Sequence, residues 1–475
     1  MSTQTVGAAL RRARGGERLQ MARAARILVG ASTAPIVAYF WAVPEWRGAA
    51  LLLAVMLWWT IDLVPDYVVA LGLIVVWNVA GIGPSAPSLS GFASPVWFLL
   101  LGVLAVGGGL AHSGILQRMA FALLSMFPAT FAGQVVAFLV GGLLMTPLLP
   151  LTVARCALTA PLARQVAETL RYPAGSRAAL GIGLAAFTGS GLLSRVFLSG
   201  ATLNLLAWSL LPPAARPGWW WWALAAAPMA LVLTVGALAI ILLACRPTDD
   251  RPIGSDVIQR LRRERGPLSP HAHVAAGAAG ALLAGLVAAP YYNIDGAWLA
   301  CLGAMALVTT GVLTREQFRS SIDWPFLIFL GVILSLPAMV HHIGADAQVA
   351  EALLPALTLT HGSPVWTLVL LFAIVTAARF VLSEWVAVPL FTATVVPLAP
   401  TVGLHPWVAM FVVLSAANLW SLPYQFASYL AFWSGSGGHL FAHAQVRAFS
   451  VAYVLLSLCG LLVSIPLWRL LGLLP

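Results

Sequence analysis

Residues 146–161 read TPLLPLTVARCALTAP, and this stretch decides how the rest of the chain is interpreted. The sequence on both sides is apolar, so Pro147, Pro150 and Arg155 fall where the hydrocarbon of a bilayer would surround a simple span. A broken backbone and a buried charge are both costly at that depth, and they occur where a segment lines a site or lies inside protein. The stretch therefore predicts a broken, re-entrant segment.

The composition is that of a membrane protein. Hydrophobic residues make up 61% of the 475 residues and charged residues only 8%, whereas soluble domains carry roughly 25% charged residues. A membrane-spanning helix needs about 20 apolar residues. On this basis we predict an all-α polytopic membrane protein with about 11 transmembrane helices and two re-entrant hairpins.

The arginines set the orientation in the membrane. All 25 basic residues are arginine, and nineteen of them fall on cytoplasmic segments when the N-terminus is placed inside. This is the positive-inside pattern. The surplus of +10 is thus a topology signal, and nucleic acid is not an expected partner. We predict a multi-pass protein of the bacterial inner (plasma) membrane with a cytoplasmic N-terminus.

The chain divides into halves at its one long hydrophilic segment. Its predicted parts are a basic cytoplasmic arm (1–26), the first span and first repeat (27–245) with a re-entrant hairpin at 131–165, a cytoplasmic linker (246–271), and a second repeat (272–475) with a re-entrant hairpin at 363–398. Because the two repeats enter the membrane from opposite sides, they are predicted to be inverted. Inverted repeats with broken helices are typical of secondary transporters.

Two further segments carry structural predictions. The apolar stretch 178–211 is too long for one crossing and contains TGSGLLSRVFLSGATLN, a polar middle with glycines, which predicts a discontinuous helix. The tryptophans at 219–222 open the next span and predict an aromatic belt at the outer interface.

Several segments resemble a known family. GFASPVWFLL, PLTVARCALTAP and SRVFLSGATLN resemble the divalent anion/sodium symporter family (DASS) of the ion transporter superfamily, especially its citrate and dicarboxylate branch. That branch typically reads P-S-N-T-A-R at the first hairpin tip and S-x-x-F-L-T-G-x-x-x-N in the broken span. In the second half, SEWVAVPLFTATVVP is similar to the family's T-E-F-x-S-N-T-A-T tract, and Pro423 stands in the place of the last broken span's proline.

The resemblance, together with the polar residues of the broken stretches, predicts a substrate site at the two hairpin tips and the two broken spans. Its residues are Thr152, Arg155, Arg195, Ser199, Gly200, Thr202, Asn204, Ser383, Glu384, Pro423 and Gln425. In the family such residues bind sodium and substrate carboxylates, so sodium sites are placed near Thr152, Gly200 and Ala387. This chain has Leu-Thr-Val and Ala-Val-Pro where the family has Ser-Asn-Thr twice. We therefore expect weak or absent sodium coupling, with anion exchange or a proton on Glu384 as the substitute.

Arg155 and Glu384 each leave alternatives open. A guanidinium can clamp a carboxylate or a sulfate by two parallel hydrogen bonds and stays charged, so Arg155 is the best candidate for anion binding. Its alternative is a structural arginine that snorkels to the cytoplasmic interface. Glu384 can carry a proton, hold a cation or cap a hairpin helix.

The leading hypothesis is a secondary active transporter of small anions, either di- or tricarboxylates or sulfate-like ions. The family's architecture implies a homodimer in the lipid bilayer and an elevator-type mechanism. The alternatives are a sodium/proton antiporter or arsenite-type carrier of the same superfamily, and a non-transporting sensor or scaffold. The sequence has no HExxH, GxSxG or Walker motif, which argues against an enzyme or an ATP-driven pump. No cofactor is expected apart from Na⁺ or H⁺ as a coupling ion.

Overall fold

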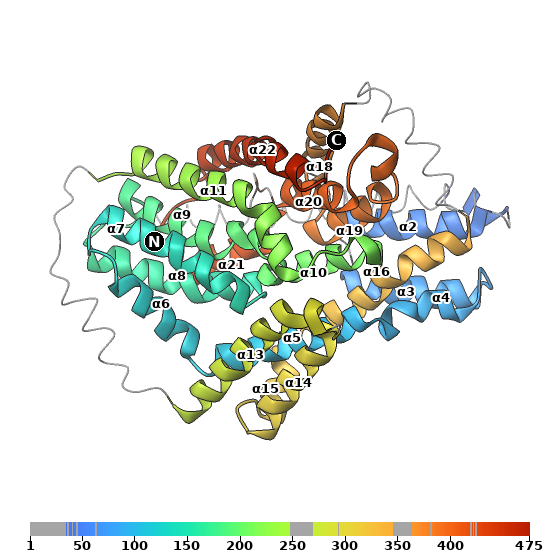
Figure 1. Ribbon diagram of the computed structural model, residues 1–475, viewed down its shortest axis with the longest axis horizontal. Helices are drawn as coiled ribbons and strands as arrows, with labels where there is room; N and C mark the ends of the chain where they lie inside the picture. The colour runs from blue at the N-terminus through green and yellow to red at the C-terminus, as the bar shows by residue number, and fades with distance from the viewer. Residues whose placement is uncertain are drawn as a thin grey trace, which may run out of the picture. The chain divides into compact units, whose positions relative to one another are not determined.

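In the computed structural model, every regular element among the described residues is a helix (Figure 1). The described residues are 46–61, 64–247, 269–292, 294–344, 363–380, 382–418 and 425–475, with the single positions 35, 38, 39, 41–43, 420 and 422. The predicted basic arm, most of the first span, most of the linker and Pro423 lie outside the described residues. The chain forms two compact units, Met1–Ala93 with Trp324–Val349, and Ser94–Asp323 with Ala350–Pro475.

The smaller unit is built around one long helix of the second half. Its elements are α2 (Arg47–Ile61), α3 (Asp66–Val79), α4 (Ser85–Leu89), η2 (Ser90–Ala93) and α16 (Trp324–His342). Helix α16 packs against α3, α4 and η2. The closest approach is at Gly91, whose N–H donates to Ser335 Oγ at 2.9 Å. A Cβ atom at Gly91 would lie 2.0 Å from the Gly331 carbonyl oxygen, so only glycine fits there.

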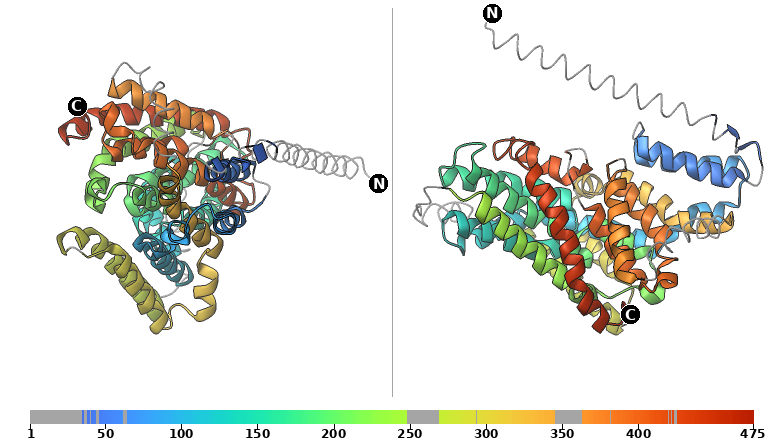
Figure 2. Two further views of the ribbon diagram at one scale, coloured as in Figure 1. Left: turned by 90° about the vertical axis from the view of Figure 1, so that its right-hand side faces the viewer. Right: turned by 90° about the horizontal axis from the view of Figure 1, so that it is seen from above.

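The larger unit contains both predicted hairpins. Its first part comprises α5 (Pro95–His112), α6 (Ile115–Ser125), α7 (Phe131–Met145), η3 (Thr146–Leu148), α8 (Thr152–Thr169), α9 (Arg177–Ser190), η4 (Leu192–Val196), η5 (Leu198–Gly200), α10 (Thr202–Ser209), η6 (Pro213–Ala215) and α11 (Trp219–Ala244). Its second part comprises α13 (Pro270–Tyr292), α14 (Gly296–Thr309), α15 (Arg315–Ser321), α18 (Pro364–Ala378), α19 (Glu384–Val395), η7 (Ala399–Val402), α20 (Pro406–Ala417), α21 (Ala427–Gly435) and α22 (Arg447–Leu470). Helix α22 lies along α11 (Figure 2).

The predicted break in the first hairpin is present. Helix α7 ends at Met145 and α8 begins at Thr152, with extended backbone at Leu149 between them. Pro147 and Pro150 have no N–H to donate, and two such residues within four positions disfavour a continuous helix here. Both α7 and α8 pack against α9, and Arg155 of α8 donates to the carbonyl of Ser190, the last residue of α9. That the two helices enter and leave on one side of the membrane stays a prediction.

The predicted discontinuous helix is confirmed. Helix α9 ends at Ser190, and two short 3₁₀ turns lead to α10, with extended backbone at Phe197 and Ala201. Nearly the whole segment is buried inside the protein. An irregular backbone at membrane depth is tolerated only under such burial, because its carbonyl and N–H groups need partners.

The second hairpin repeats this arrangement. Helices α18 and α19 both pack against α20, as α7 and α8 pack against α9 (Figure 1). Helix α20 also ends early, at Ala417, before the short helix α21. The larger unit thus holds two helix pairs, each packed on the first part of an interrupted helix, while the inverted repeats stay a prediction.

Seven helices among the described residues are long and apolar enough to cross a membrane. Several others, such as α18 and α20, are apolar but shorter. The fold is therefore that of a multi-pass all-α membrane protein, as predicted, while the number of about 11 spans stays a prediction.

Candidate functional site

A buried polar cluster lies at the break between α9 and α10. Arg195, which is only 4% exposed, donates from Nη2 to Asn418 Oδ1 at 2.8 Å. Its Nη1 atom lies 3.5 Å from Asn204 Oδ1, and Nη2 lies 3.8 Å from Glu384 Oε2. Asn418 follows α20 and Glu384 begins α19. The cluster therefore joins both interrupted helices and the second hairpin.

The side chains of this cluster also satisfy the irregular backbone. Asn204 Nδ2 donates to the carbonyl oxygens of Ser194 and Phe197 at 2.8 Å each. Asn418 Nδ2 donates to the Leu192 carbonyl at 2.8 Å. Buried carbonyl groups that leave a helix need such donors. The two amides therefore fix the shape of the break and so the position of Arg195.

One donor in the cluster has no partner. The Nε–H of Arg195 is buried and makes no hydrogen bond to any described residue. Leaving a buried donor unsatisfied costs about 1–3 kcal/mol, and more for a charged group. A buried cation with a free donor, beside amide oxygens and one carboxylate, can bind an anion.

Arg155 lies at a second buried cluster, at the tip of the first hairpin. Its Nε donates to the Ser190 carbonyl at 2.9 Å, and its Nη1 donates to the carbonyls of Thr146 (3.4 Å) and Leu149. Its Nη2 lies 3.4 Å from Thr152 Oγ1. The side chain is 2% exposed and donates to backbone carbonyls, so Arg155 has the contacts of a structural arginine, without reaching the protein surface by snorkelling. The contacts make Arg155 a brace between the hairpin tip and the end of α9.

Ser199, Gly200 and Thr202 attach the break to the same hairpin tip. Ser199 Oγ donates to the Pro147 carbonyl at 3.1 Å, and Thr202 donates from N and Oγ1 to the Pro150 carbonyl at 3.1 and 3.3 Å. A Cβ atom at Gly200 would lie 2.2 Å from the Ser194 carbonyl oxygen. These predicted site residues are brought together, and the hydroxyls of Ser199 and Thr202 donate to protein backbone.

The tryptophans at 219–222 do not form a uniform aromatic belt. Trp222 is fully buried and donates from Nε1 to the Arg195 carbonyl at 3.0 Å, while Trp219 donates to Ser199 Oγ at 2.9 Å. Trp220 is 69% exposed and fits the predicted belt. Successive helical residues point about 100° apart, so one face of α11 turns inward. Two tryptophans therefore support the site, which the sequence did not indicate.

The second hairpin tip carries a buried arginine of its own. Arg379 follows α18, donates from Nε to the Ala417 carbonyl at 2.9 Å, and also donates to the Leu382 and Gln425 carbonyls. Gln425 returns the contact by donating from Nε2 to the Arg379 carbonyl at 3.0 Å. Gln425 is therefore placed at this tip, where its side-chain amide also accepts the Leu422 N–H at 2.8 Å.

The remaining predicted site residues are placed as follows. Ser383 is exposed and precedes α19 without capping it through its side chain, and Ala387 is buried within α19. Pro423 is outside the described residues. Within the described ranges, no group of three or more His, Cys, Asp or Glu side chains is arranged to hold a metal ion.

Sequence reasoning missed Asn418. Its only signal is an amide directly after α20, an almost wholly apolar helix. The sequence places this amide 223 positions after Arg195, its hydrogen-bond partner. Arg195 and Asn418 meet because the two interrupted helices pack together, and no sequence pattern indicates that packing.

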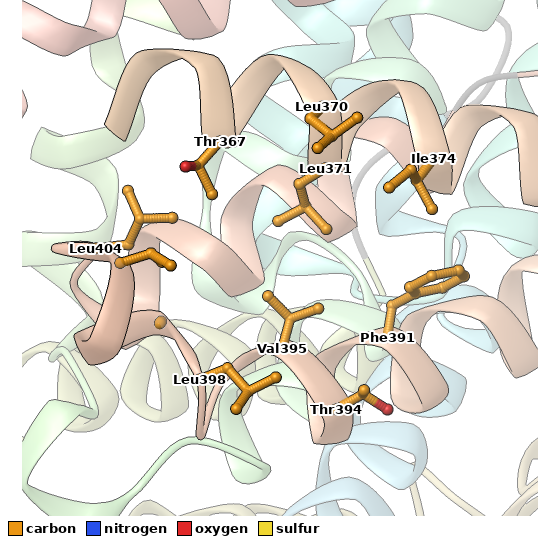
Figure 3. Close-up of a pocket in the computed structure, with 11 residues that line it drawn as sticks. Thr367, Leu370, Leu371, Ile374, Phe391, Thr394, Val395, Leu398 and Leu404 are labelled. Atoms are coloured by element: carbon orange, nitrogen blue, oxygen red, sulfur yellow. The ribbon is translucent and has the colours of Figure 1, made fainter. Parts of the chain in front are cut away.

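A separate cavity of about 110 Å³ lies between the two helices of the second hairpin (Figure 3). Leu371 and Ile374 of α18 face Phe391 and Val395 of α19 across it. Its lining is apolar apart from two threonines. Such a cavity offers no charged donor, so it is not a candidate anion site.

Two hairpins packed on two interrupted helices, with buried arginines at the breaks, define a multi-pass membrane protein of the transporter class. The chain belongs to the citrate transporter family (CitMHS), whose model matches residues 51–417. The structure resembles that of the YdaH transporter of Alcanivorax borkumensis, with a TM-score of 0.52 and 16% sequence identity, over 85% of this chain and 90% of that one. At that identity the likeness concerns the fold alone. A search of curated protein sequences gave no match.

Proposed function

We propose that the protein is a secondary active transporter of small anions, chiefly di- or tricarboxylates, with sulfate-like ions as the other class. The observation that carries the proposal is the unpartnered Nε–H of buried Arg195 at the meeting point of two interrupted helices. Membership of the citrate transporter family supports a carboxylate as the ligand. A carboxylate can supply an acceptor to Nε and a second one to the neighbouring Nη2 in a bidentate pair.

The balance of buried charge supports an anionic substrate. Among the described residues, the buried charged side chains are those of Arg155, Arg195, Arg379 and Glu384, a net charge of +2. Uncompensated buried charge is costly, and a bound dianion would compensate it. The same balance disfavours a cation as the transported ion, so it weighs against a sodium/proton antiporter.

The contacts of two arginines support weak sodium dependence. Sodium is a hard cation that prefers oxygen ligands, and transporters of this build use the carbonyl oxygens of unwound segments. Here Arg155 donates hydrogen bonds to carbonyls of the first tip and of Ser190. Arg379 donates to carbonyls of the second tip and of Ala417. A sodium ion would compete with a fixed guanidinium for these oxygens. Coupling by anion exchange or by a proton therefore replaces it in our proposal.

The proposed mechanism is elevator-type alternating access in a homodimer. The resemblance to the divalent anion/sodium symporter family supports it. The distribution of the arginines supports a bacterial inner membrane with the N-terminus in the cytoplasm.

Uptake into proteoliposomes tests the proposal. Purified protein is reconstituted, and uptake of radiolabelled citrate, succinate and sulfate is measured under a sodium gradient, under a proton gradient, and with internal unlabelled anion. We expect saturable uptake that changes little when sodium is replaced by choline. No uptake of any anion under any condition would refute the proposal, and dissipation of a Na⁺ or H⁺ gradient without anion would favour the antiporter. Absence of thermal stabilisation by all three anions would favour a sensor or scaffold.

A further inference from the structure

We propose that Glu384 is the internal counter-ion of Arg195, which neutralises that cation when no substrate is bound and so allows the empty site to reorient across the membrane. A substrate carboxylate takes the place of Glu384 on Arg195 during the loaded half of the cycle, and the displaced carboxylate keeps its electrostatic interaction with Arg379. The inference rests on the proposed anion transport and adds the residue that permits net transport.

The pair is buried but loosely held. Glu384 Oε2 lies 3.8 Å from Arg195 Nη2, which is within ion-pair range and longer than a hydrogen bond. Glu384 is 8% exposed and begins α19, where the helix dipole favours a negative charge. The carboxylate is therefore stabilised where it is, without being locked onto the guanidinium. An incoming carboxylate can displace it.

Arg195 is the buried arginine that needs this counter-ion. Arg155 and Arg379 both donate to carbonyls at the ends of helices, Ser190 of α9 and Ala417 of α20, and helix C-termini carry a partial negative charge. Arg195 instead contacts the neutral amides of Asn418 and Asn204. Within the described part of the chain, Glu384 is the one buried acidic side chain.

Other charged and titratable groups act on the pair without replacing Glu384. Arg379 interacts electrostatically with both partners, and Tyr453 of α22 interacts with Arg195. Arg379 adds positive charge, and the Tyr453 hydroxyl donates to the Leu192 carbonyl at 3.3 Å. Neither offers Arg195 an anion, so the neutralising role falls to Glu384.

The consequence concerns the empty carrier. A site with an uncompensated buried cation cannot move through a low-dielectric layer without a large penalty. With Glu384 ionised, the empty site keeps a paired Arg195 and can return, which gives net uptake. With a neutral side chain at position 384, the site can return only when an anion is bound. Such a variant exchanges anions one for one and accumulates little.

The test compares two modes of transport in one variant. Glu384→Gln and wild type are reconstituted, and radiolabelled citrate, succinate and sulfate are measured for net uptake into empty vesicles and for exchange against the same internal anion. We expect the substitution to lower net uptake at least about tenfold more than it lowers exchange. Breaking a buried ion pair costs at least the free energy that corresponds to about a tenfold change. Glu168→Gln is the matched control. It removes the carboxylate of an exposed pair with Arg164, and we expect the ratio of the two modes to stay at the wild-type value.

Retention of the charge provides the second test. Glu384→Asp keeps a carboxylate at position 384 on a shorter side chain, so it should lose less net uptake relative to exchange than Glu384→Gln does. If Glu384→Gln is not monodisperse, Glu384→Asp replaces it, and its retracted charge should lower net uptake more than exchange. Equal loss of both modes, an unchanged ratio, or a wild type capable only of exchange would overturn the inference. A wild type that transports no anion in either mode would refute the proposed function, and the inference would fall with it.

Discussion

Arg155 and Arg379 make the same contact in the two halves of the larger unit. The Nε atom of each lies 2.9 Å from the carbonyl oxygen of the last residue of a helix that is then interrupted, Ser190 of α9 or Ala417 of α20. Each guanidinium also donates to a carbonyl at its own hairpin tip, Leu149 or Leu382. The matching contacts indicate that an arginine brace holds each hairpin to its interrupted helix.

The brace at Arg155 is testable by unfolding. Arg155→Gln leaves buried carbonyl oxygens without donors, so we expect it to lower the free energy of unfolding by about 3–5 kcal/mol. Thermal unfolding in detergent measures this, with Arg164→Gln as the control. Arg164 lies in an exposed pair with Glu168, and surface pairs contribute about 0–1 kcal/mol. A variant of wild-type stability that no longer responds to citrate would show instead that Arg155 is the anion clamp.

Much of the fold could be predicted from the sequence because its decisive signals are local. The closely spaced Pro147 and Pro150 favour the first break, and the glycines and polar residues of 188–204 favour the second. Apolar runs predicted the helices, and α11 begins at Trp219, where the sequence predicted that a span opens. Each of these signals acts on the backbone within a few residues of its own position in the chain.

The site was less predictable because its contacts join distant segments. Arg195, Asn204 and Glu384 were recognised as site residues from polar side chains inside apolar stretches, and the structure brings them together. Asn418 and Trp222 were not, since their partners are set by how α20 and α11 pack. Arg155 was recognised, but whether it binds ligand or backbone depends on carbonyls whose direction no sequence pattern specifies.

Gly200 offers a test of the close packing at the break. A Cβ atom there would lie 2.2 Å from the Ser194 carbonyl and 2.8 Å from Thr146 Cγ2, so Gly200→Ala must displace backbone. We expect loss of thermal stability and of transport together, by about 1–3 kcal/mol in unfolding free energy. Gly277→Ala is the control, since a Cβ atom on that residue of α13 meets nothing within 4 Å. It should be neutral or stabilising by up to about 1 kcal/mol, and equal effects of the two substitutions would contradict the packing described here.

His405 gives the protein a pH-dependent element outside the spans. It precedes α20 and accepts the Trp407 N–H at Nδ1 (3.2 Å), and burial lowers its pKa below the ordinary value of 6.5. As the pH falls, His405 therefore binds a proton more readily in the unfolded chain than in the folded protein. The stability that the neutral His405 contributes is complete above pH 6.5 and is lost as the pH falls below that value. His405→Asn keeps a capping acceptor without a titrating group. We expect it to flatten the dependence of the melting temperature on pH between about 5 and 7, and an unchanged slope would contradict this role.

Arg195 provides the most direct test of the anion site. Removing a buried, charge-assisted donor pair costs about 2–5 kcal/mol in binding, so Arg195→Gln should weaken citrate binding by about 30-fold or more. Citrate-induced thermal stabilisation of the purified protein measures this. Because Arg195→Gln also leaves Glu384 without its 3.8 Å partner, the double variant Arg195→Gln with Glu384→Gln is needed. It buries no unpaired carboxylate at this pair and should regain stability without regaining citrate binding. Full stabilisation by citrate in either variant would show that Arg195 does not bind the anion. Arg155 and Arg379 would then be the remaining candidates.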